Sequence, residues 1–550
     1  MSQDKRARAE SRREFLRLSA ASGIVVIANR VGIGSAVRFA QSTGAKSRGA
    51  FELEEVTIAE LQRGMKSGKW TARSVAEKYL SRIGEMDKRG PALNSIIELN
   101  PEALAIADAL DKERKVKGER GPMHGVPVLI KDNLDTADRM STTAGSLALA
   151  GSIPLKDSFV VQRLRAAGAV ILGKTNLSEW ANIRSSHSSS GWSGRGGQTK
   201  NPYVLDRNPC GSSSGSGVAI AANFAAVAVG TETDGSVVCP SSANSLVGIK
   251  PTLGLVSRSG IVPIAHSQDT AGPMARTVSD AAILLGAMAG IDPDDAITSE
   301  SRGHSSTDYT EFLDANGLRG ARIGVARKSF GFNDQVDQVI NSAIDVIKRL
   351  GAEIIDPADI ETSGKFDDSE LEVLLYELKA DLNKYLAALG PRAPVKSLKE
   401  IIEFNERNKE REMPYFGQDL FIKAEAKGPL TDKAYLEALA KNQRMSRAEG
   451  IDAVMSKNRL DAMVAPTGGP PWPTDLLNGD HFTGGYSSPS AVAGYPHITV
   501  PAGYIHGLPL GVSFFAGAYS EAKLIKYAYA FEQATKARRA PRFLDRVELG

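Results

Sequence analysis

The stretch PCGSSSGSGVAIAA, residues 209–222, shows most clearly that the middle of the chain is a folded domain. Its first nine residues hold four serines and three glycines, a composition typical of flexible linkers. The run continues directly into GVAIAANFAA, residues 217–226, which predicts a buried helix. Because a linker stays polar on both sides, we interpret the serine-glycine run as a loop inside a domain.

Short apolar runs that end in Gly, Asn or Asp lie on both sides of this loop, and helical patterns alternate with them. The runs before residue 260 are VPVLIKDN (126–133), GAVILGKTN (168–176), AAVAVGTETDG (225–235) and VGIKPTLGLV (247–256). Similar runs return at LDAMVAP (460–466), HITVPAG (497–503) and LPLGVSFFAG (508–517). The alternation predicts an α/β fold with a largely buried sheet. We expect one large domain over residues 50–550.

Residues 340–455 interrupt this pattern with a charged, helical segment. Leu371, Leu374, Leu375 and Leu378 are spaced to share one helix face. We therefore expect a helical insertion here, after which the late strands complete the first sheet.

Composition narrows the range of partners. The chain has 550 residues, 42% hydrophobic and 24% charged, as in a globular protein with a large core. A net charge of +3 indicates neither a nucleic-acid partner nor a membrane surface. Two cysteines, Cys210 and Cys239, exclude a disulfide-stapled scaffold and a multi-cysteine zinc site. The sequence leaves open whether these two are bridged.

The N-terminal segment 1–40 is typical of a targeting signal. Arg12 and Arg13 precede an apolar segment that ends near Ala36 or Ala40, an order that resembles a twin-arginine export signal. No apolar run there reaches the ~18 residues of a membrane span. A basic amphipathic helix or an uncleaved anchor is the alternative. We expect an exported protein, periplasmic or secreted, with no stable membrane association after signal removal; the cleavage point stays open.

The sequence lacks the common motifs for metal binding and for nucleotide binding. The seven histidines include no metal-binding H-E-x-x-H spacing, and neither dinucleotide-binding nor P-loop glycine patterns occur. We therefore expect a reaction that needs no cofactor and no metal ion.

The serine run formally contains G-x-S-x-G at residues 211–215, the nucleophile elbow of α/β-hydrolases. An elbow requires a buried strand directly before it. The preceding TKNPYVLDRNPC, residues 199–210, is polar and rich in turn formers, so the match is interpreted as accidental.

Two other positions have a better setting for chemistry. Ser236 follows the predicted strand 225–230 through a T-D-G turn, whose successive N–H groups suit an oxyanion; a plain strand-ending turn is the alternative. Lys131 ends the run 126–130. It either extends to solvent or is buried, and burial lowers a lysine pKa by ~3–5 units toward that of a general base.

Taken together, these blocks resemble the amidase signature family. The resemblance rests on HGVPVLIKDN, GAVILGKTNLSEWAN, PCGSSSGSGVAIAA and GTETDGSVVCPSSANSLVGIKPT, and it spans about residues 52–545. It implies one domain whose core is a mixed β-sheet covered by helices on both faces.

The resemblance also implies roles for individual residues. Ser236 is then the nucleophile, Lys131 the base, and Ser212 the bridge between them, with a cis peptide bond to Gly211. The backbone N–H groups that form the oxyanion hole are those of Thr233, Asp234, Gly235 and Ser236. Ser214 stands where many relatives have glycine. A nucleophilic Cys239 is the alternative at this site.

Within the family, ETDGSVVCP, NLSEWAN and YFGQDLFIKAEA look most like peptide amidases. We therefore expect an amide hydrolase that releases ammonia from C-terminal peptide amides through an acyl-enzyme, acting as a monomer or homodimer. Hydrolysis of fatty-acid or aryl amides, esters or carbamates is the alternative. Further alternatives are a non-catalytic binding protein and an amidotransferase subunit.

Overall fold

The computed structural model describes residues 51–391 and 393–549, and residues Glu52–Gly550 form one compact unit. The predicted export signal, residues 1–40, lies outside the described residues. No described helix is both long and apolar enough to cross a bilayer.

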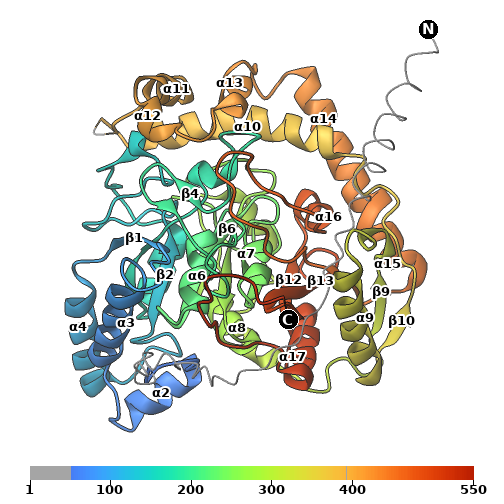
Figure 1. Ribbon diagram of the computed structural model, residues 1–550, viewed down its shortest axis with the longest axis horizontal. Coiled ribbons are helices and arrows are strands. Elements are labelled where there is room, and N and C mark those ends of the chain that lie inside the picture. Colours follow the sequence, from blue (N-terminus) through green and yellow to red (C-terminus); the bar gives the residue numbers. More distant parts are fainter. Residues whose placement is uncertain (1–50, 392, 550) are drawn as a thin grey trace, which may run out of the picture. The chain divides into compact units, whose positions relative to one another are not determined.

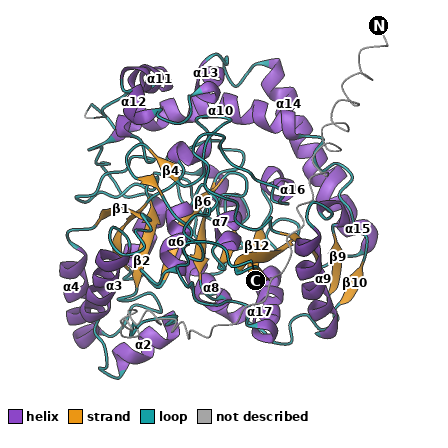
Figure 2. Ribbon diagram, in the orientation of Figure 1, coloured by secondary structure: helices purple, strands orange, loops and turns teal. Residues whose placement is uncertain are grey.

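The core of this unit is a mixed sheet of eleven strands, with helices on both of its faces (Figures 1 and 2). In spatial order the strands are β1 (Ile96–Leu99), β3 (Val170–Thr175), β2 (Pro127–Lys131), β6 (Val227–Glu232), β8 (Thr270–Ala275), β7 (Val247–Lys250), β12 (His497–Ile505), β13 (Leu508–Phe515), β11 (Ala462–Pro466), β9 (Arg322–Val325) and β10 (Glu353–Ile355). Every residue of β2, β3, β6, β8, β11 and β13 is buried, as strands covered on both faces require. The predicted fold class is confirmed.

Strands β3, β2 and β6 run parallel, and β6 pairs antiparallel with β8. In this register Ile130 of β2 lies opposite Val229 of β6. The carboxyl ends of the two strands therefore meet at one edge of the sheet, where ligands bind in open α/β sheets. Lys131 ends β2 there, and Thr231 and Glu232 end β6.

The strands late in the sequence complete the same sheet, as predicted. β12 pairs with β7, β13 with β12, and β11 with β13. The segment 340–455 is not wholly helical, however. It begins inside α9 and contains β10, which pairs in parallel with β9.

The other helices precede β1, lie in the connections between the strands or follow β13. They are α2 (Ile58–Lys66), α3 (Ala72–Met86), α4 (Ala103–Lys117), α5 (Phe159–Ala166), α6 (Ser214–Ala221), α7 (Val238–Ala243), α8 (Val278–Met288), α9 (Asp334–Arg349), α15 (Asp452–Asn458), α16 (Ser488–Ala493) and α17 (Glu521–Thr535). The helix that begins in the serine run, α6, is buried over its whole length and packs on β2, β3, β6 and β8.

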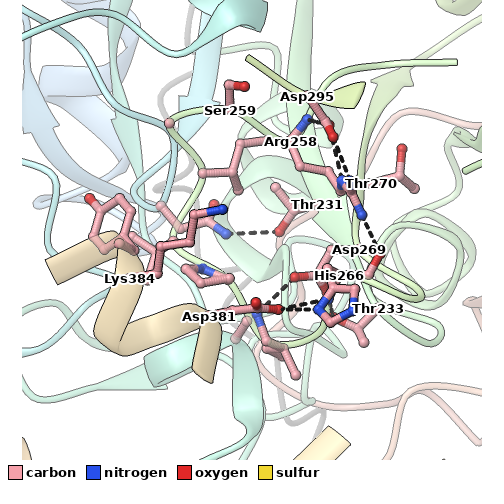
Figure 3. A pocket seen from close by; sticks show the side chains of 18 of the residues that line it. Thr231, Thr233, Arg258, Ser259, His266, Asp269, Thr270, Asp295, Asp381 and Lys384 are labelled. Carbon is pink, nitrogen blue, oxygen red and sulfur yellow. Dashed lines mark hydrogen bonds and ion pairs between the residues drawn. The ribbon is translucent and has the colours of Figure 1, made fainter. Parts of the chain in front are cut away.

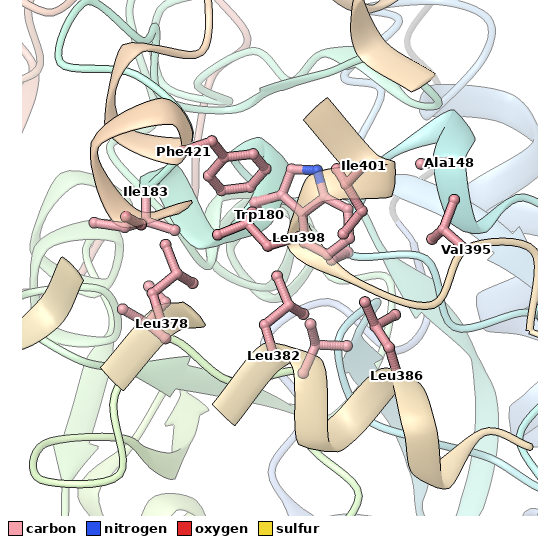
Figure 4. Packing of buried hydrophobic residues seen from close by; sticks show 14 of the residues in the cluster. Ala148, Trp180, Ile183, Leu378, Leu382, Leu386, Val395, Leu398, Ile401 and Phe421 are labelled. Carbon is pink, nitrogen blue, oxygen red and sulfur yellow. The ribbon is translucent and has the colours of Figure 1, made fainter. Parts of the chain in front are cut away.

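The inserted helices α10 (Asp367–Ala388), α11 (Leu398–Arg407), α12 (Lys409–Glu412), α13 (Asp419–Glu425) and α14 (Lys433–Gln443) lie together along one side of the unit (Figure 1). An apolar cluster joins α10, α11 and α13 to the loop that carries Trp180 (Figure 4). Trp180 and Phe421 meet edge to face with ring centroids 5.7 Å apart.

The predicted leucine face of this insertion is only partly correct. Leu375 and Leu378 are buried, but Leu371 is 39% exposed. The buried positions of the first turns are Ser369, Glu370 and Val373, and the apolar stripe instead continues through Leu382 and Leu386. Apolar spacing predicted the helix correctly but predicted the wrong buried side for its first turn. The side that is buried there carries the carboxyl of Glu370.

Candidate active site

Lys131 is fully buried at the end of β2. Its Nζ lies 2.8 Å from Ser212 Oγ, 2.8 Å from Thr231 Oγ1 and 3.2 Å from the Thr231 carbonyl oxygen. Desolvation lowers the pKa of Lys131 to about 7, against the opposing influence of Asp269 and Glu232. A large fraction of this amine is therefore neutral near pH 7 and can accept a proton. Of the two alternatives for Lys131, burial is the observed one.

Thr231 and Asn133 orient this amine, and sequence reasoning did not single them out. Asn133 Nδ2 donates to Thr231 Oγ1 over 3.0 Å. Both residues stand in blocks that carried the resemblance, Asn133 in KDN and Thr231 in GTETDG. The position of these two residues within those blocks was the one sequence signal that could have identified them. The contact with Lys131 arises only because β2 and β6 are neighbours in the sheet.

The serine run is a loop held by its own hydroxyls. Ser213 Oγ donates to the Thr231 carbonyl, Ser214 Oγ to the Cys210 carbonyl and Ser216 Oγ to the Val229 carbonyl, at 3.0, 2.6 and 3.2 Å. The peptide bond between Gly211 and Ser212 is cis, as the resemblance implies. Residues 205–213 contain no strand, which agrees with interpreting the G-x-S-x-G match as accidental.

Gly215 shows why glycine recurs in this loop. A Cβ there would collide with the carbonyl oxygens of Asn176 and Ser95. A larger residue would therefore push the start of α6 away from the sheet edge.

Ser236 follows β6 in a strand–turn–helix arrangement. Gly235 has φ +76°, a conformation that favours glycine, and α7 starts two residues after Ser236. The backbone N–H of Ser213 donates to the Ser236 carbonyl over 3.1 Å, so the two serine segments are joined directly. The N–H groups of Asp234, Gly235 and Ser236 donate to no other described residue. Unused N–H donors in succession suit an anion.

A disulfide links Cys210 to Cys239, with their Cα atoms 6.0 Å apart. This settles the point that the sequence left open. The bridge ties the residue just before Gly211 to the first turn of α7, and it leaves Cys239 without a free thiol. The alternative of a nucleophilic Cys239 therefore has no support in the structure.

A cavity of about 420 Å³ opens beside the ends of β2 and β6 (Figure 3). Residues 231–233 and Asn133 line it on one side, and the loop 258–264 on another. A third wall is one face of α10, with Asp381, Lys384, Tyr385 and Ala388 at helical spacing. Of the predicted site residues, only Thr233 lines the cavity; Lys131, Ser212 and Ser236 are not among its lining residues.

Asp269 connects the two sides of the cavity. It accepts hydrogen bonds from Thr233 Oγ1 at 2.6 Å and from the backbone N–H groups of Ile264 and Ala265 at 2.8 and 2.9 Å. Burial raises the pKa of Asp269 to about 6, against these hydrogen bonds. One carboxyl thus fixes both the predicted oxyanion turn and the apolar loop.

His266 ties the same loop to α10. Its Nδ1 lies 2.8 Å from Asp381 Oδ2 and its Nε2 3.4 Å from Glu377 Oε1, and the hydrogen bond to Asp381 raises the pKa of His266. Among the described residues, these three side chains are the group whose spacing is compatible with a metal ion. Their mutual charge pairing accounts for the geometry without an ion, so we interpret the group as a clamp on the cavity wall.

Comparison with known proteins is consistent with this geometry. The sequence model of the Amidase family matches residues 74–525. The chain belongs to the amidase family. The match covers strand β2 with Lys131, the turn with Ser236 and the inserted helices.

Individual members of the family span the chain. A native peptide amidase structure from Stenotrophomonas maltophilia is 49% identical, with a TM-score of 0.87 over 90% of this chain and 99% of that one. A protein of Arabidopsis thaliana named a probable amidase is 43% identical, over 90% of this chain and 93% of its own. A glutamyl-tRNA(Gln) amidotransferase subunit of Halorhodospira halophila is 34% identical, over 88% of this chain and 98% of its own.

Proposed function

We propose that this amidase hydrolyses C-terminal peptide amides through Ser236, Ser212 and Lys131. Neutral Lys131 accepts the Ser212 proton while Ser212 takes the proton of Ser236, and Ser236 Oγ attacks the carboxamide carbon. The N–H groups of residues 233–236 bind the developing oxyanion. Lys131 returns the proton through Ser212 to the leaving nitrogen, so that ammonia departs and Ser236 is acylated. Water then attacks the acyl carbon and gives a proton through Ser212 to Lys131, and that proton returns to Ser236 Oγ as the acid product is released.

The observation that carries this proposal is the contact between Lys131 and Ser212. A buried lysine with a pKa near neutrality, 2.8 Å from a serine hydroxyl, is placed to act as a base. Ser212 in turn belongs to the loop that is hydrogen-bonded to the Ser236 backbone. A serine is a weak nucleophile by itself, so this arrangement supplies the proton acceptor that it needs.

The cavity supports an amide with a sizeable acyl group. Its volume lies in the range of small-ligand sites, and the wall of residues 261–264 is Ile-Val-Pro-Ile. Charged groups on α10 and Arg258 surround this apolar wall (Figure 3). An amino-acid side chain beside a terminal carboxamide matches such a mixed lining, and similarity to the S. maltophilia peptide amidase favours the same substrate class.

Ammonia release from a substrate panel tests the proposal. Purified protein is offered dipeptide amides, fatty amides, anilides and carbamates, and ammonia or amine is quantified. We expect peptide amides to be turned over most efficiently. If anilides or carbamates were hydrolysed and peptide amides were not, the proposed substrate class would be wrong. Activity that appears only with charged tRNA and partner proteins would favour the amidotransferase alternative.

We further propose that the protein is exported by way of residues 1–40. The disulfide next to the catalytic loop supports this, because disulfides persist in oxidising compartments. Cell fractionation with a mass measurement of the mature N-terminus provides the test. Full-length protein found only in the cytoplasm would contradict export.

A further inference from the structure

Glu370 brings a carboxyl from the inserted helix α10 against the predicted oxyanion turn. It is 8% exposed, and its Oε1 accepts a hydrogen bond from Gln268 Nε2 over 2.8 Å. Its carboxyl also lies close enough to the carboxyl of Asp234 for a hydrogen bond, which requires a proton on one of the two groups. The pair joins two segments that are far apart in the sequence. One is α10 of the inserted helices, and the other is the turn between β6 and α7.

Two carboxyl groups in contact must share a proton. Asp234 Oδ2 accepts from Ser488 Oγ over 2.6 Å, while Asp234 Oδ1 is buried and no donor group of the described residues reaches it. Two buried carboxylates side by side repel, so one of them stays protonated. A protonated Glu370 supplies the donor that Asp234 Oδ1 otherwise lacks.

The surrounding groups decide which carboxyl holds the proton. Burial and the charge of Asp367 raise the pKa of Asp234, but the Ser487 and Ser488 hydroxyls and the Lys250 ammonium oppose this and favour its ionised form. Glu370 faces the charges of Asp234 and Asp367, which oppose its ionisation more strongly than Gln268 favours it. Burial and the Asp234 charge raise the pKa of Glu370 well above its ordinary value near 4.5. The proton therefore resides on Glu370.

Gln268 extends the contact to the neighbouring residue of the turn. Its Nε2 also lies 3.3 Å from the Thr233 carbonyl oxygen. Glu370 is thus linked to two of the four residues whose N–H groups are assigned to the oxyanion hole, directly to Asp234 and through Gln268 to Thr233.

We propose that Glu370 is a positioning residue, a neutral carboxylic acid that donates to Asp234 and thereby holds the turn 233–236 in its oxyanion-binding conformation. This inference rests on the proposed function, since it concerns the same reaction. It makes the inserted helix part of the catalytic apparatus as well as a wall of the cavity. The ionisation of Glu370 at high pH would release the turn.

The kinetic test compares Glu370→Gln with Glu370→Ala. Glutamine reproduces the protonated acid, because its Oε1 accepts from Gln268 and its Nε2 donates to Asp234. We expect Glu370→Ala to lower kcat by about 10²-fold, as for a misplaced catalytic group, with little change in KM. Glu370→Gln should keep most of the activity and should lack the decline of kcat at high pH that we expect of the wild type. Glu372→Gln, on the same helix but paired with Lys427, is the matched control.

A second measurement does not depend on turnover. Because folding raises the Glu370 pKa, its contribution to stability is complete below pH ~4.3 and is lost as pH rises through the folded value. Glu370→Gln lacks this dependence, so its free energy of unfolding, relative to the wild type, should increase with pH. Urea unfolding of the wild type, Glu370→Gln and Glu372→Gln at several pH values measures it.

The outcomes separate the two proposals. Equal kcat losses in the Gln and Ala variants, or parallel stability profiles for the wild type and Glu370→Gln, would overturn the assignment of Glu370. A wild type that hydrolyses no amide would instead remove the proposed function, while the unfolding profiles would still show whether Glu370 holds a proton.

Discussion

Lys131 Nζ and Ser212 Oγ lie 2.8 Å apart, although 81 residues separate them along the chain. Strand β2 delivers the lysine to the sheet edge, and the loop before α6 delivers the serine. Neither segment contains the partner, so the pair exists only where the parallel strands β2 and β6 and the buried helix α6 meet.

Replacing Lys131 should abolish turnover near neutral pH. In Lys131→Met the side chain keeps its length but cannot accept a proton, and we expect kcat/KM to fall by at least ~10²–10⁴-fold. In the wild type the base works only when neutral. Activity should therefore rise with pH through a midpoint near the Lys131 pKa of about 7. A pH–rate profile checks this; a Met variant with wild-type rates would remove Lys131 from the mechanism.

Replacing Ser236 and replacing Ser212 should block different steps of the reaction. Ser236→Ala removes the nucleophile, and we expect a loss of ~10⁴-fold or more together with the disappearance of any acyl-enzyme in acid-quenched samples. Ser212→Ala breaks the proton path, so any residual turnover still passes through acylated Ser236. Intact-protein mass spectrometry distinguishes the two. Ser189→Ala, which removes a buried hydroxyl without a hydrogen-bond partner among the described residues, is the control.

The Cys210–Cys239 disulfide should contribute substantially to stability. It closes a loop with a sequence separation of 29, for which loop-closure entropy corresponds to about 3–4 kcal/mol. The Cys210→Ala/Cys239→Ala double variant should lose about that free energy of unfolding in urea titrations without reductant. Thiol titration of the denatured wild type should find no thiols before reduction and two after it. Two thiols before reduction would contradict the bridge.

The apolar cluster beneath α10 should set both stability and the shape of the cavity wall. Leu382 is fully buried in this cluster (Figure 4), so Leu382→Ala should cost about 2–5 kcal/mol of unfolding free energy and raise KM. Leu371→Ala, on the same helix but exposed, should stay within about 0.5 kcal/mol of the wild type. If both changes had the same small effect, the packing assigned to α10 would be wrong.

Much of the architecture was accessible from local pattern. The apolar runs 126–130 and 225–230 predicted β2 and β6 to within two residues, because a strand buried on both faces must be continuously apolar. The capping box of α2, from Thr57 to Glu60, is likewise a local signal with a local cause. Local setting singled out Lys131 and Ser236, and the family resemblance added Ser212 and the role of each residue.

Other features had no local signal. Leu371 and Glu370 are adjacent in a helical pattern, yet the leucine is exposed and the carboxyl is buried, because Asp234 and Gln268 lie opposite Glu370 across the contact. Hydrophobic periodicity assigns polar side chains to the exposed face of a helix. It contains no information on a polar partner that is distant in the sequence and that allows a polar side chain to be buried.

The sequence by itself determined which segments become buried strands and which residue types stand at their ends, since burial and turn chemistry act over a few neighbouring residues. The tertiary structure decided that Lys131 is buried beside Ser212, that Cys210 and Cys239 are joined, and that α10 forms one wall of the cavity. Desolvation and pairing depend on atoms brought together by the sheet, and these determine the pKa of Lys131 and with it the chemistry of the site.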